Sequence, residues 1–217
     1  MRTWPHLPST AHLVLTPSMP AVSQLEQWCE RLSASGFTSV RTNALGPAMV
    51  RCTSSAGFVP AQDLVLLVHD LVDVPPRGAP TTRRLPVAWR PAAAELDRTS
   101  FPDGWGLDLA GVGDVCDATP RHRARASLVD GRLVGYAVSG RDTRTAFLQR
   151  IAVAPSSRRS GHAGALVGDA LRWARRAGSA EMYVNTPRDN HAALALYDGL
   201  GFRRLPEGLQ VMERSLV

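Results

Sequence analysis

The stretch from Phe147 to Phe202 constrains the fold most, because strand and helix signals alternate there in an order that few folds share. Apolar runs and helical spacing predict a strand, a loop, a helix, a second strand and a second helix, over residues 147–155, 156–164, 165–177, 181–186 and 190–200. A strand that leads through a glycine-containing loop into a helix brings backbone N–H groups to the positive end of that helix. Such an arrangement binds anions, most often phosphate.

Two short motifs occur within this stretch. Residues 158–163 (RRSGHA) fit R-x-x-G-x-[GA], and residues 190–197 (NHAALALY) fit N-x-x-A-x-x-L-Y, followed by Gly201-Phe202. With these motifs the chain resembles the GNAT acetyltransferase superfamily, which uses acetyl-coenzyme A, over roughly Pro86 to Leu216. The resemblance implies an α+β, three-layer fold with a mixed, mostly antiparallel central sheet flanked by helices. The plainer alternative is that the glycines only shape a tight turn.

The basic residues are all arginine, 25 in number, and there is no lysine. This excludes a lysine Schiff base, self-acetylation on lysine and a P-loop, whose lysine is obligatory. The net charge of +6 suits an anionic cofactor. The arginines are scattered and have few aromatic neighbours, so a basic solvated surface is a better interpretation than a nucleic-acid interface.

The cysteines, Cys29, Cys52 and Cys116, are odd in number and lack C-x-x-C spacing, so reduced thiols are expected and no metal site is predicted. No apolar run reaches the roughly 18 residues of a spanning helix, and the N-terminus lacks a signal-peptide core. We expect a soluble, cytoplasmic protein that does not bind membranes. The sequence leaves monomer and homodimer open.

The first part of the chain repeats the element order of the last part. It predicts strand, helix, strand, helix and strand over residues 12–15, 23–35, 38–42, 47–56 and 64–68. A shift of 144 positions places Val40 on Val184 and Gly57-Phe58 on Gly201-Phe202. We therefore predict a smaller, degenerate GNAT-like half-repeat. Pro17 to Pro20 stand in the loop position without glycine, so this half serves structure or substrate binding, not the cofactor.

These patterns divide the chain into residues 1–73 as the half-repeat, 74–83 as a Pro/Gly-rich linker and 84–217 as the acetyltransferase domain. Within that domain we predict a strand, a helix that begins at Pro91, and a β-hairpin turning at Asp130-Gly131, with the strands over residues 85–90, 125–129 and 132–139. By the resemblance, the kinked segment 101–108 lines the acceptor side. An ordinary surface turn is an equal alternative.

The resemblance also assigns site residues. The strands at 151–153 and 183–185 should splay apart and admit the pantetheine arm. The cofactor-binding residues are Ile151, Ala152, Val153, Arg158, Arg159, Ser160, Gly161, His162, Ala163, Gly164, Asn190 and Tyr197. Asn190 would contact the cofactor arm or cap its helix, and the Val153 N–H would stabilise the oxyanion. Tyr197 is the predicted catalytic residue, a general acid for the coenzyme A sulfur, with a core tyrosine as the alternative.

The general base is left open. Related N-terminal acetyltransferases of ribosomal proteins carry a glutamate where this chain has Asn185, and neither Asn185 nor Gln149 can accept a proton. The remaining candidates are a water chain and the carboxylates Asp103, Asp108, Asp114 and Glu213. The predicted function is acetyl transfer from acetyl-coenzyme A to a primary amine, of a small molecule or a protein N-terminus. The alternative is a coenzyme A-binding pseudoenzyme or interaction module.

Overall fold

The computed structural model describes residues 3–16 and 18–217, so Pro17 and the first two residues lie outside it. The chain forms two compact units. Unit 1 consists of Met1–Leu66, Asn185–His191 and Arg204–Val217, and unit 2 of Leu67–Val184 and Ala192–Arg203. This grouping differs from the expected division into 1–73, 74–83 and 84–217, because the chain returns to unit 1 after most of unit 2 is complete.

Unit 1 is built on a sheet whose strands, in spatial order, are β1 (Thr3–Trp4), β2 (Leu7–Leu13), β3 (Ser39–Thr42), β11 (Leu209–Ser215) and β4 (Val59–His69). β2 and β3 are parallel, whereas β11 is antiparallel to both β3 and β4. No strand was predicted at β11. It also misplaced the first strand, which begins at Leu7 and not at His12, and shortened the one that runs to His69.

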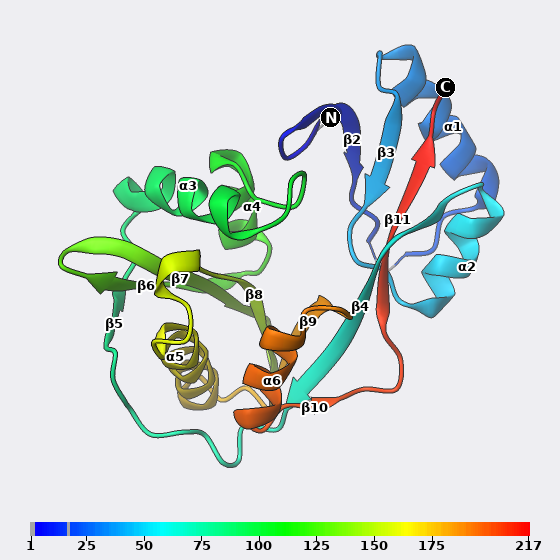
Figure 1. Cartoon of the computed structure of the whole chain (residues 1–217). Helices are drawn as coiled ribbons and strands as arrows, with labels where there is room; N and C mark the ends of the chain where they lie inside the picture. The colour runs from blue at the N-terminus through cyan, green and yellow to red at the C-terminus, as the bar shows by residue number, and fades with distance from the viewer. Residues whose placement is uncertain (1–2, 17) are drawn as a thin grey trace. The chain divides into compact units, whose positions relative to one another are not determined.

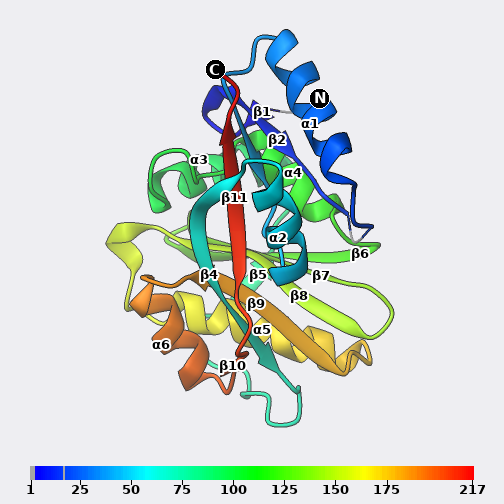
Figure 2. The same cartoon turned by 90° about the vertical axis from the view of Figure 1, so that its right-hand side faces the viewer.

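Two helices cover one side of this sheet, α1 (Val22–Ala34) and α2 (Pro47–Ser55) (Figures 1 and 2). Both agree with the predicted helices to within one residue. In α1 the buried Leu25 and Cys29 are one turn apart, as an amphipathic helix requires. They pack with Val40 of β3 and Met212 of β11 into the core of unit 1, so the last strand of the chain helps to close this core.

The sheet of unit 2 has the strand order β9 (Glu181–Pro187), β8 (Thr145–Val153), β7 (Arg132–Arg141), β6 (Arg121–Val129) and β5 (Thr82–Arg84). Every pairing along β5 to β8 is antiparallel, and β8 pairs with β9 in parallel. This is the expected mixed, mostly antiparallel sheet. The predicted hairpin is confirmed, and Asp130 and Gly131 both have positive φ, at 48° and 77°, as a type I′ turn requires.

Helices lie on both faces of this sheet, which gives unit 2 three layers (Figure 1). α3 (Arg90–Ser100) and α4 (Leu109–Asp117) cover one face, and α5 (His162–Arg176) covers the other. α6 (His191–Gly199) follows β9. The core beneath α3 and α4 is formed by Leu85, Ala93, Leu96, Cys116, Ala126, Tyr136, Val138 and Ala152. In the described part of the chain, no helix combines the length and the apolarity that crossing a membrane would demand.

Three local predictions for unit 2 need correction. The strand expected over residues 85–90 is wrong, because the strand that pairs with β6 is β5 (Thr82–Arg84). Pro86 has no N–H to donate to a strand, and a 3₁₀ turn at Val87–Trp89 follows it. The helix expected from residue 165 begins at His162, directly after the left-handed Gly161. α4 was not predicted, although Asp108, which caps it, is a typical start signal.

The expected linker is bound along α5 as a strap, residues 72–82. Arg175 Nη1 donates to the Val72 carbonyl at 3.2 Å, and Arg172 Nη1 donates to the Pro75 carbonyl at 3.0 Å. At the other end of the strap, Thr82 Oγ1 donates to Asp169 Oδ2 at 3.2 Å. Side chains of α5 thus hold this polar, proline-rich strap in place through hydrogen bonds to its backbone carbonyls and to the Thr82 hydroxyl.

Candidate active site

The N-terminus of α5 has the features of an anion site. Gly161 is its N-cap residue, with φ at 80°, and no side chain caps the helix. The first helical hydrogen bond runs from the Ala165 N–H to the Gly161 carbonyl, at 3.0 Å. The N–H groups of residues 162–164 therefore have no acceptor within the helix, and they lie at the positive end of its dipole. A pyrophosphate group fits these donors.

The side chains of this loop are used for structure. Arg158 Nη2 donates to the Ser100 carbonyl at 3.0 Å, at the end of α3. The His162 ring is buried, and its Nδ1 lies 2.8 Å from Ser127 Oγ. The side chains of Arg159 and Ser160 are exposed. The loop therefore offers an anion its backbone N–H groups and the exposed Arg159, while Arg158 and His162 hold the loop in place.

The ladder between β8 and β9 is short. Their ladder covers three positions, from Thr145↔Glu181 to Phe147↔Tyr183, and ends there among the described residues. Two positions further on, Gln149 is the extra residue of a β-bulge against β7. Beyond the last paired position, β8 forms no ladder with β9 among the described residues.

The backbone of β8 presents donors at this open edge. The Ala154 N–H donates to the Val134 carbonyl at 2.8 Å, so it points toward β7. Because successive N–H groups of a strand point to opposite edges, those of Val153 and Ile151 point away from β7, toward the gap. Amides of an extended pantetheine arm can pair with such groups.

Tyr197 lies on α6 and is buried, with 2% of its surface exposed. Its ring is 5.5 Å from the ring of Phe202, and burial raises the pKa of its hydroxyl well above 10. None of the described residues forms a hydrogen bond with that hydroxyl. α6 packs near the loop of residues 158–164, the predicted anion loop, since a Cβ atom added to Gly164 would be 4.0 Å from Leu196 Cδ1. Both the acid role and the core role therefore remain predictions for Tyr197.

Asn190 directly precedes α6 and belongs to unit 1. Its N–H donates to the Pro187 carbonyl at 3.0 Å. Its contact with the cofactor arm stays a prediction.

The candidate bases have different surroundings. Asp108 caps α4 and accepts the Gly111 N–H at 2.7 Å, and Glu213 of unit 1 is paired with Arg41 at 2.9 Å. Asp103 is exposed in the segment between α3 and α4, and Asp114 lies on α4. Asp103 is thus the candidate with the freest approach to solvent. Over residues 3–16 and 18–217, no three or more His, Cys, Asp or Glu side chains gather closely enough to hold a metal ion.

Sequence reasoning missed a buried polar cluster next to the segment 101–108, formed by Asp97 of α3, Tyr136 of β7 and Arg150 of β8. The signal available was Asp97 itself, a carboxylate among the apolar positions of an amphipathic helix. Its partners are 39 and 53 positions away in the sequence, so no local pattern identifies them.

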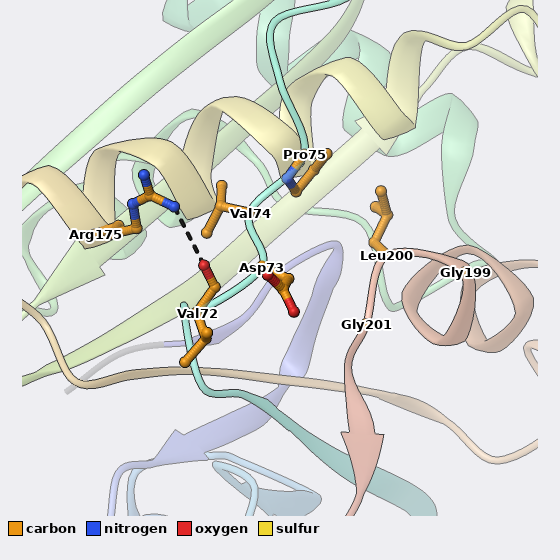
Figure 3. A pocket seen from close by; sticks show the side chains of 8 residues that line it. All are labelled: Val72, Asp73, Val74, Pro75, Arg175, Gly199, Leu200 and Gly201. Carbon is orange, nitrogen blue, oxygen red and sulfur yellow. Dashed lines mark hydrogen bonds between the residues drawn. The ribbon is translucent and has the colours of Figure 1, made fainter.

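A cavity of about 430 Å³ lies at the C-terminal end of α6 (Figure 3). Figure 3 shows it between the strap and the turn after α6, with the Arg175 guanidinium directed at the Val72 carbonyl. Its lining residues are Val72, Asp73, Val74, Pro75, Arg175, Gly199, Leu200 and Gly201. None of them is a predicted cofactor residue, and Arg175 is about 20 Å along α5 from its first turn at 1.5 Å per residue. This cavity is not the anion site.

Comparison with known proteins agrees with this geometry. The model of the Acetyltransferase (GNAT) family matches residues 90–202, which is more than half of the chain. The chain therefore belongs to the GNAT acetyltransferase family. It is an acetyltransferase, and the cosubstrate of this family is acetyl-coenzyme A.

Among individual relatives, an uncharacterized N-acetyltransferase of Mycobacterium tuberculosis is 29% identical over 134 residues, 61% of this chain and 85% of that protein. A putative GNAT acetyltransferase of Novosphingobium aromaticivorans is similar in structure, with a TM-score of 0.60 and 21% identity over 73% of this chain and 66% of that one. A tandem GNAT protein from the clavulanic acid biosynthesis pathway has a TM-score of 0.65 and 15% identity, over 90% and 69% of the two chains. The last match extends the similarity in fold over most of both units.

Proposed function

We propose that the protein transfers an acetyl group from acetyl-coenzyme A to a primary amine, of a small molecule or a protein N-terminus, by direct attack on the thioester. The observation that carries this proposal is the early end of the β8–β9 ladder at Phe147↔Tyr183. It leaves the N–H groups of Ile151 and Val153 at an open edge, in the same unit as the unpaired N–H groups at the start of α5. A thioester substrate with a pyrophosphate at its other end matches both sets of donors.

Different residues are proposed to carry out different parts of the transfer. The Val153 N–H is directed at the gap, where it can donate to the carbonyl oxygen as that oxygen gains negative charge. The amine attacks as its neutral form, and the C–S bond breaks as the thiolate leaves. Tyr197 is the proposed donor of the proton that the sulfur takes up. Its raised pKa keeps the hydroxyl protonated over the whole physiological range.

Proton removal from the amine is assigned to water in contact with Asp103. The other carboxylates have structural partners or lie on a helix, whereas Asp103 is exposed in the segment that borders the acceptor side. A water-mediated route does not require the carboxylate to touch the amine.

Unit 1 is proposed to be a degenerate half-repeat of the same fold. β2–α1–β3 and β8–α5–β9 are both strand–helix–strand units with parallel strands. In unit 1 the segment between β2 and α1 contains no glycine, so one acetyl-coenzyme A per chain is expected. The cytoplasm is the proposed compartment, because Cys29, Cys52 and Cys116 are free thiols.

The decisive experiment uses isotopically labelled acetyl-coenzyme A. The protein is incubated with cell extract and the label is followed by mass spectrometry. Label in an amine metabolite or at a protein N-terminus supports the proposal and names the acceptor. Tight binding of coenzyme A without transfer of label to any amine would instead indicate a binding module.

A further inference from the structure

A buried ion pair connects α3 to the central strand of unit 2. Asp97 is fully buried, and Arg150 Nε donates to its Oδ2 atom at 2.9 Å. The second guanidinium nitrogen, Nη2, donates to Oδ1, so the pair is bidentate. The Tyr136 hydroxyl donates to Oδ2 at 2.6 Å. Burial and the nearby Asp97 carboxylate raise the pKa of Tyr136, which keeps this hydroxyl a donor.

The same pair holds the segment between α3 and α4. The Leu107 N–H donates to Asp97 Oδ1 at 2.6 Å, and Arg150 Nη2 donates to the Trp105 carbonyl at 2.8 Å. The Arg150 guanidinium also lies over the Phe101 ring, 3.6 Å from its centroid. Three points of the segment 101–108 are therefore fixed by one ion pair, at its start, its middle and near its end.

Arg150 lies directly after the β-bulge of β8. It follows the bulge residue Gln149 and precedes Ile151, whose N–H faces the gap between the strands. The residue before the segment, Ser100, is held by the loop after β8, because Arg158 Nη2 donates to the Ser100 carbonyl. Arg150 thus joins the strand that carries the proposed thioester site to the segment that follows α3.

A buried ion pair is a poor way to gain stability. Well-packed apolar residues of similar volume are often as good or better, because removing two charges from water is costly. The pair instead fixes the relative positions of the groups that it contacts. The planar guanidinium fixes three directions at once, to a carboxylate, a carbonyl and a ring face.

We propose that Arg150 is a positioning residue for the acceptor amine. Held by Asp97 and Tyr136, it fixes the segment 101–108 as a wall of the acceptor site, in register with β8. This inference rests on the proposed function. It predicts that Arg150 affects the use of the amine and does not affect the binding of acetyl-coenzyme A.

The test compares three full-length variants with the wild type. Arg150→Lys keeps the charge but loses the fork and the flat face, and Tyr136→Phe removes only one donor to Asp97. Asp169→Asn is the matched control, because it breaks a different partly buried arginine pair of the same unit, on α5. The acceptor is the amine with the highest turnover in the labelling experiment.

For Arg150→Lys, kcat/KM for the amine is expected to fall by about 10- to 100-fold, since a misplacement of ~1 Å can cost about 10²-fold. KM for acetyl-coenzyme A and the thermal shift induced by coenzyme A should stay within twofold. Hydrogen exchange at 101–108 should accelerate. Tyr136→Phe should show the same pattern at smaller size, and Asp169→Asn should leave amine kinetics and exchange at 101–108 unchanged.

Each outcome has a meaning. If both variants at the cluster change exchange at 101–108 but not kcat/KM for the amine, the ion pair is only structural and the inference is overturned. If Asp169→Asn lowers kcat/KM for the amine as much as Arg150→Lys, general destabilisation explains the loss and the inference fails. If Arg150→Lys does not fold, Tyr136→Phe decides the question alone. A wild type without any shift from coenzyme A refutes the proposed function instead, so the two failures are distinguishable.

Discussion

Pro80 of the strap lies against Gly161 of the anion loop, so that a Cβ atom added to Gly161 would be 3.2 Å from Pro80 Cδ. Gly161 also has a φ of 80°, which L side chains rarely adopt. The positive φ strains any side chain at this position, and a Cβ atom would also press on Pro80. The proposed pyrophosphate site thus depends on a residue that tolerates no substitution without strain.

The first prediction concerns Gly161→Glu. Coenzyme A at a hundredfold excess over its dissociation constant should stabilise the wild type by roughly 2.7 kcal/mol. That corresponds to a rise in Tm of several degrees, at about 2–4 °C per kcal/mol. In the variant this rise should vanish, because a negative side chain stands beside the N–H donors.

The matched control for that variant is Gly178→Glu. Gly178 follows the other end of α5, has a similar φ of 77°, and an added Cβ atom there meets nothing within 4 Å. It carries the same backbone strain away from the loop. A full coenzyme A shift in Gly178→Glu and none in Gly161→Glu supports the site, whereas equal shifts in both variants contradict it. Differential scanning fluorimetry measures both.

The second prediction concerns Tyr197→Phe. The change keeps the ring that packs on Phe202 and removes only the hydroxyl. Coenzyme A affinity should stay within a few-fold, and kcat should fall by about 10²–10⁴, the usual contribution of a positioned acid. Steady-state kinetics and calorimetry measure the two quantities. Unchanged turnover would make Tyr197 a core residue.

The raised pKa of Tyr197 adds a condition on the pH–rate profile. Because burial keeps the hydroxyl protonated above pH 10, the wild-type rate should show no loss from its ionisation up to that pH. A descending limb centred well below pH 10 that disappears in Tyr197→Phe would contradict the burial described here. Rates measured from pH 6 to pH 10 decide this.

The third prediction concerns Asp169. Burial alone would raise the pKa of its carboxyl, but the hydrogen bond and charge of Arg123, with Arg125, outweigh burial and lower it. Asp169→Asn should therefore cost about 1.5–3 kcal/mol of unfolding free energy, the value of a hydrogen bond to a charged group. The contribution is complete above pH 4, near the unfolded pKa, and is lost as the pH falls through the lower folded pKa.

The exposed pair of Glu95 and Arg98 is the control for that measurement. Their side chains are 63% and 54% exposed, so solvent screens the pair, and Glu95→Gln should not change stability measurably. Urea unfolding at pH 7 and at pH 3 compares the variants. Equal losses in Asp169→Asn and Glu95→Gln would show that burial of the Asp169 pair has no energetic effect.

The fourth prediction concerns His69, which is 2% exposed. Its Nδ1 accepts the Leu71 N–H at 2.8 Å, so that nitrogen must be unprotonated. Burial lowers the pKa of the ring, despite the nearby Asp70. Stability should therefore be complete above the unfolded pKa of about 6.5 and should fall as the pH drops below it. A variant that cannot titrate, His69→Phe, should lack this slope.

The slope is measured as Tm between pH 7.5 and pH 5. His191→Phe serves as the comparison, because His191 is exposed. Identical slopes in wild type and His69→Phe would assign the acid sensitivity to other groups.

Local patterns predicted much of the fold, and the reasons differ by element. The spacing of Leu25 and Cys29 predicted α1, and the pair Asp130-Gly131 predicted the hairpin. Each of these signals is contained within a few neighbouring residues. The glycine loop before α5 was predicted from a local motif as well, and Gly161 does precede that helix. β11 was missed because its partners are remote: Glu213 pairs with Arg41 across 172 positions.

The parts of the site that sequence reasoning missed also depend on distant partners. Asp97 and Arg150 are 53 positions apart, and neither has a neighbour in the sequence that suggests an ion pair. The strap is a second case. Arginine side chains that donate to backbone carbonyls of Val72 and Pro75 leave no recognisable spacing, so the sequence predicted a linker there and not its contacts with α5.

The position of β11 determines when unit 1 can be finished during synthesis. The strands β3 and β4 are made early, yet the strand that lies between them comprises residues 209–215. Domains usually fold as the ribosome releases them, N-terminal first. Here unit 1 cannot be completed until residues 209–215 have been made, and until then the facing edges of β3 and β4 lack their partner strand. Such edges invite pairing with other chains, so the nascent protein is exposed to aggregation until β11 has been made.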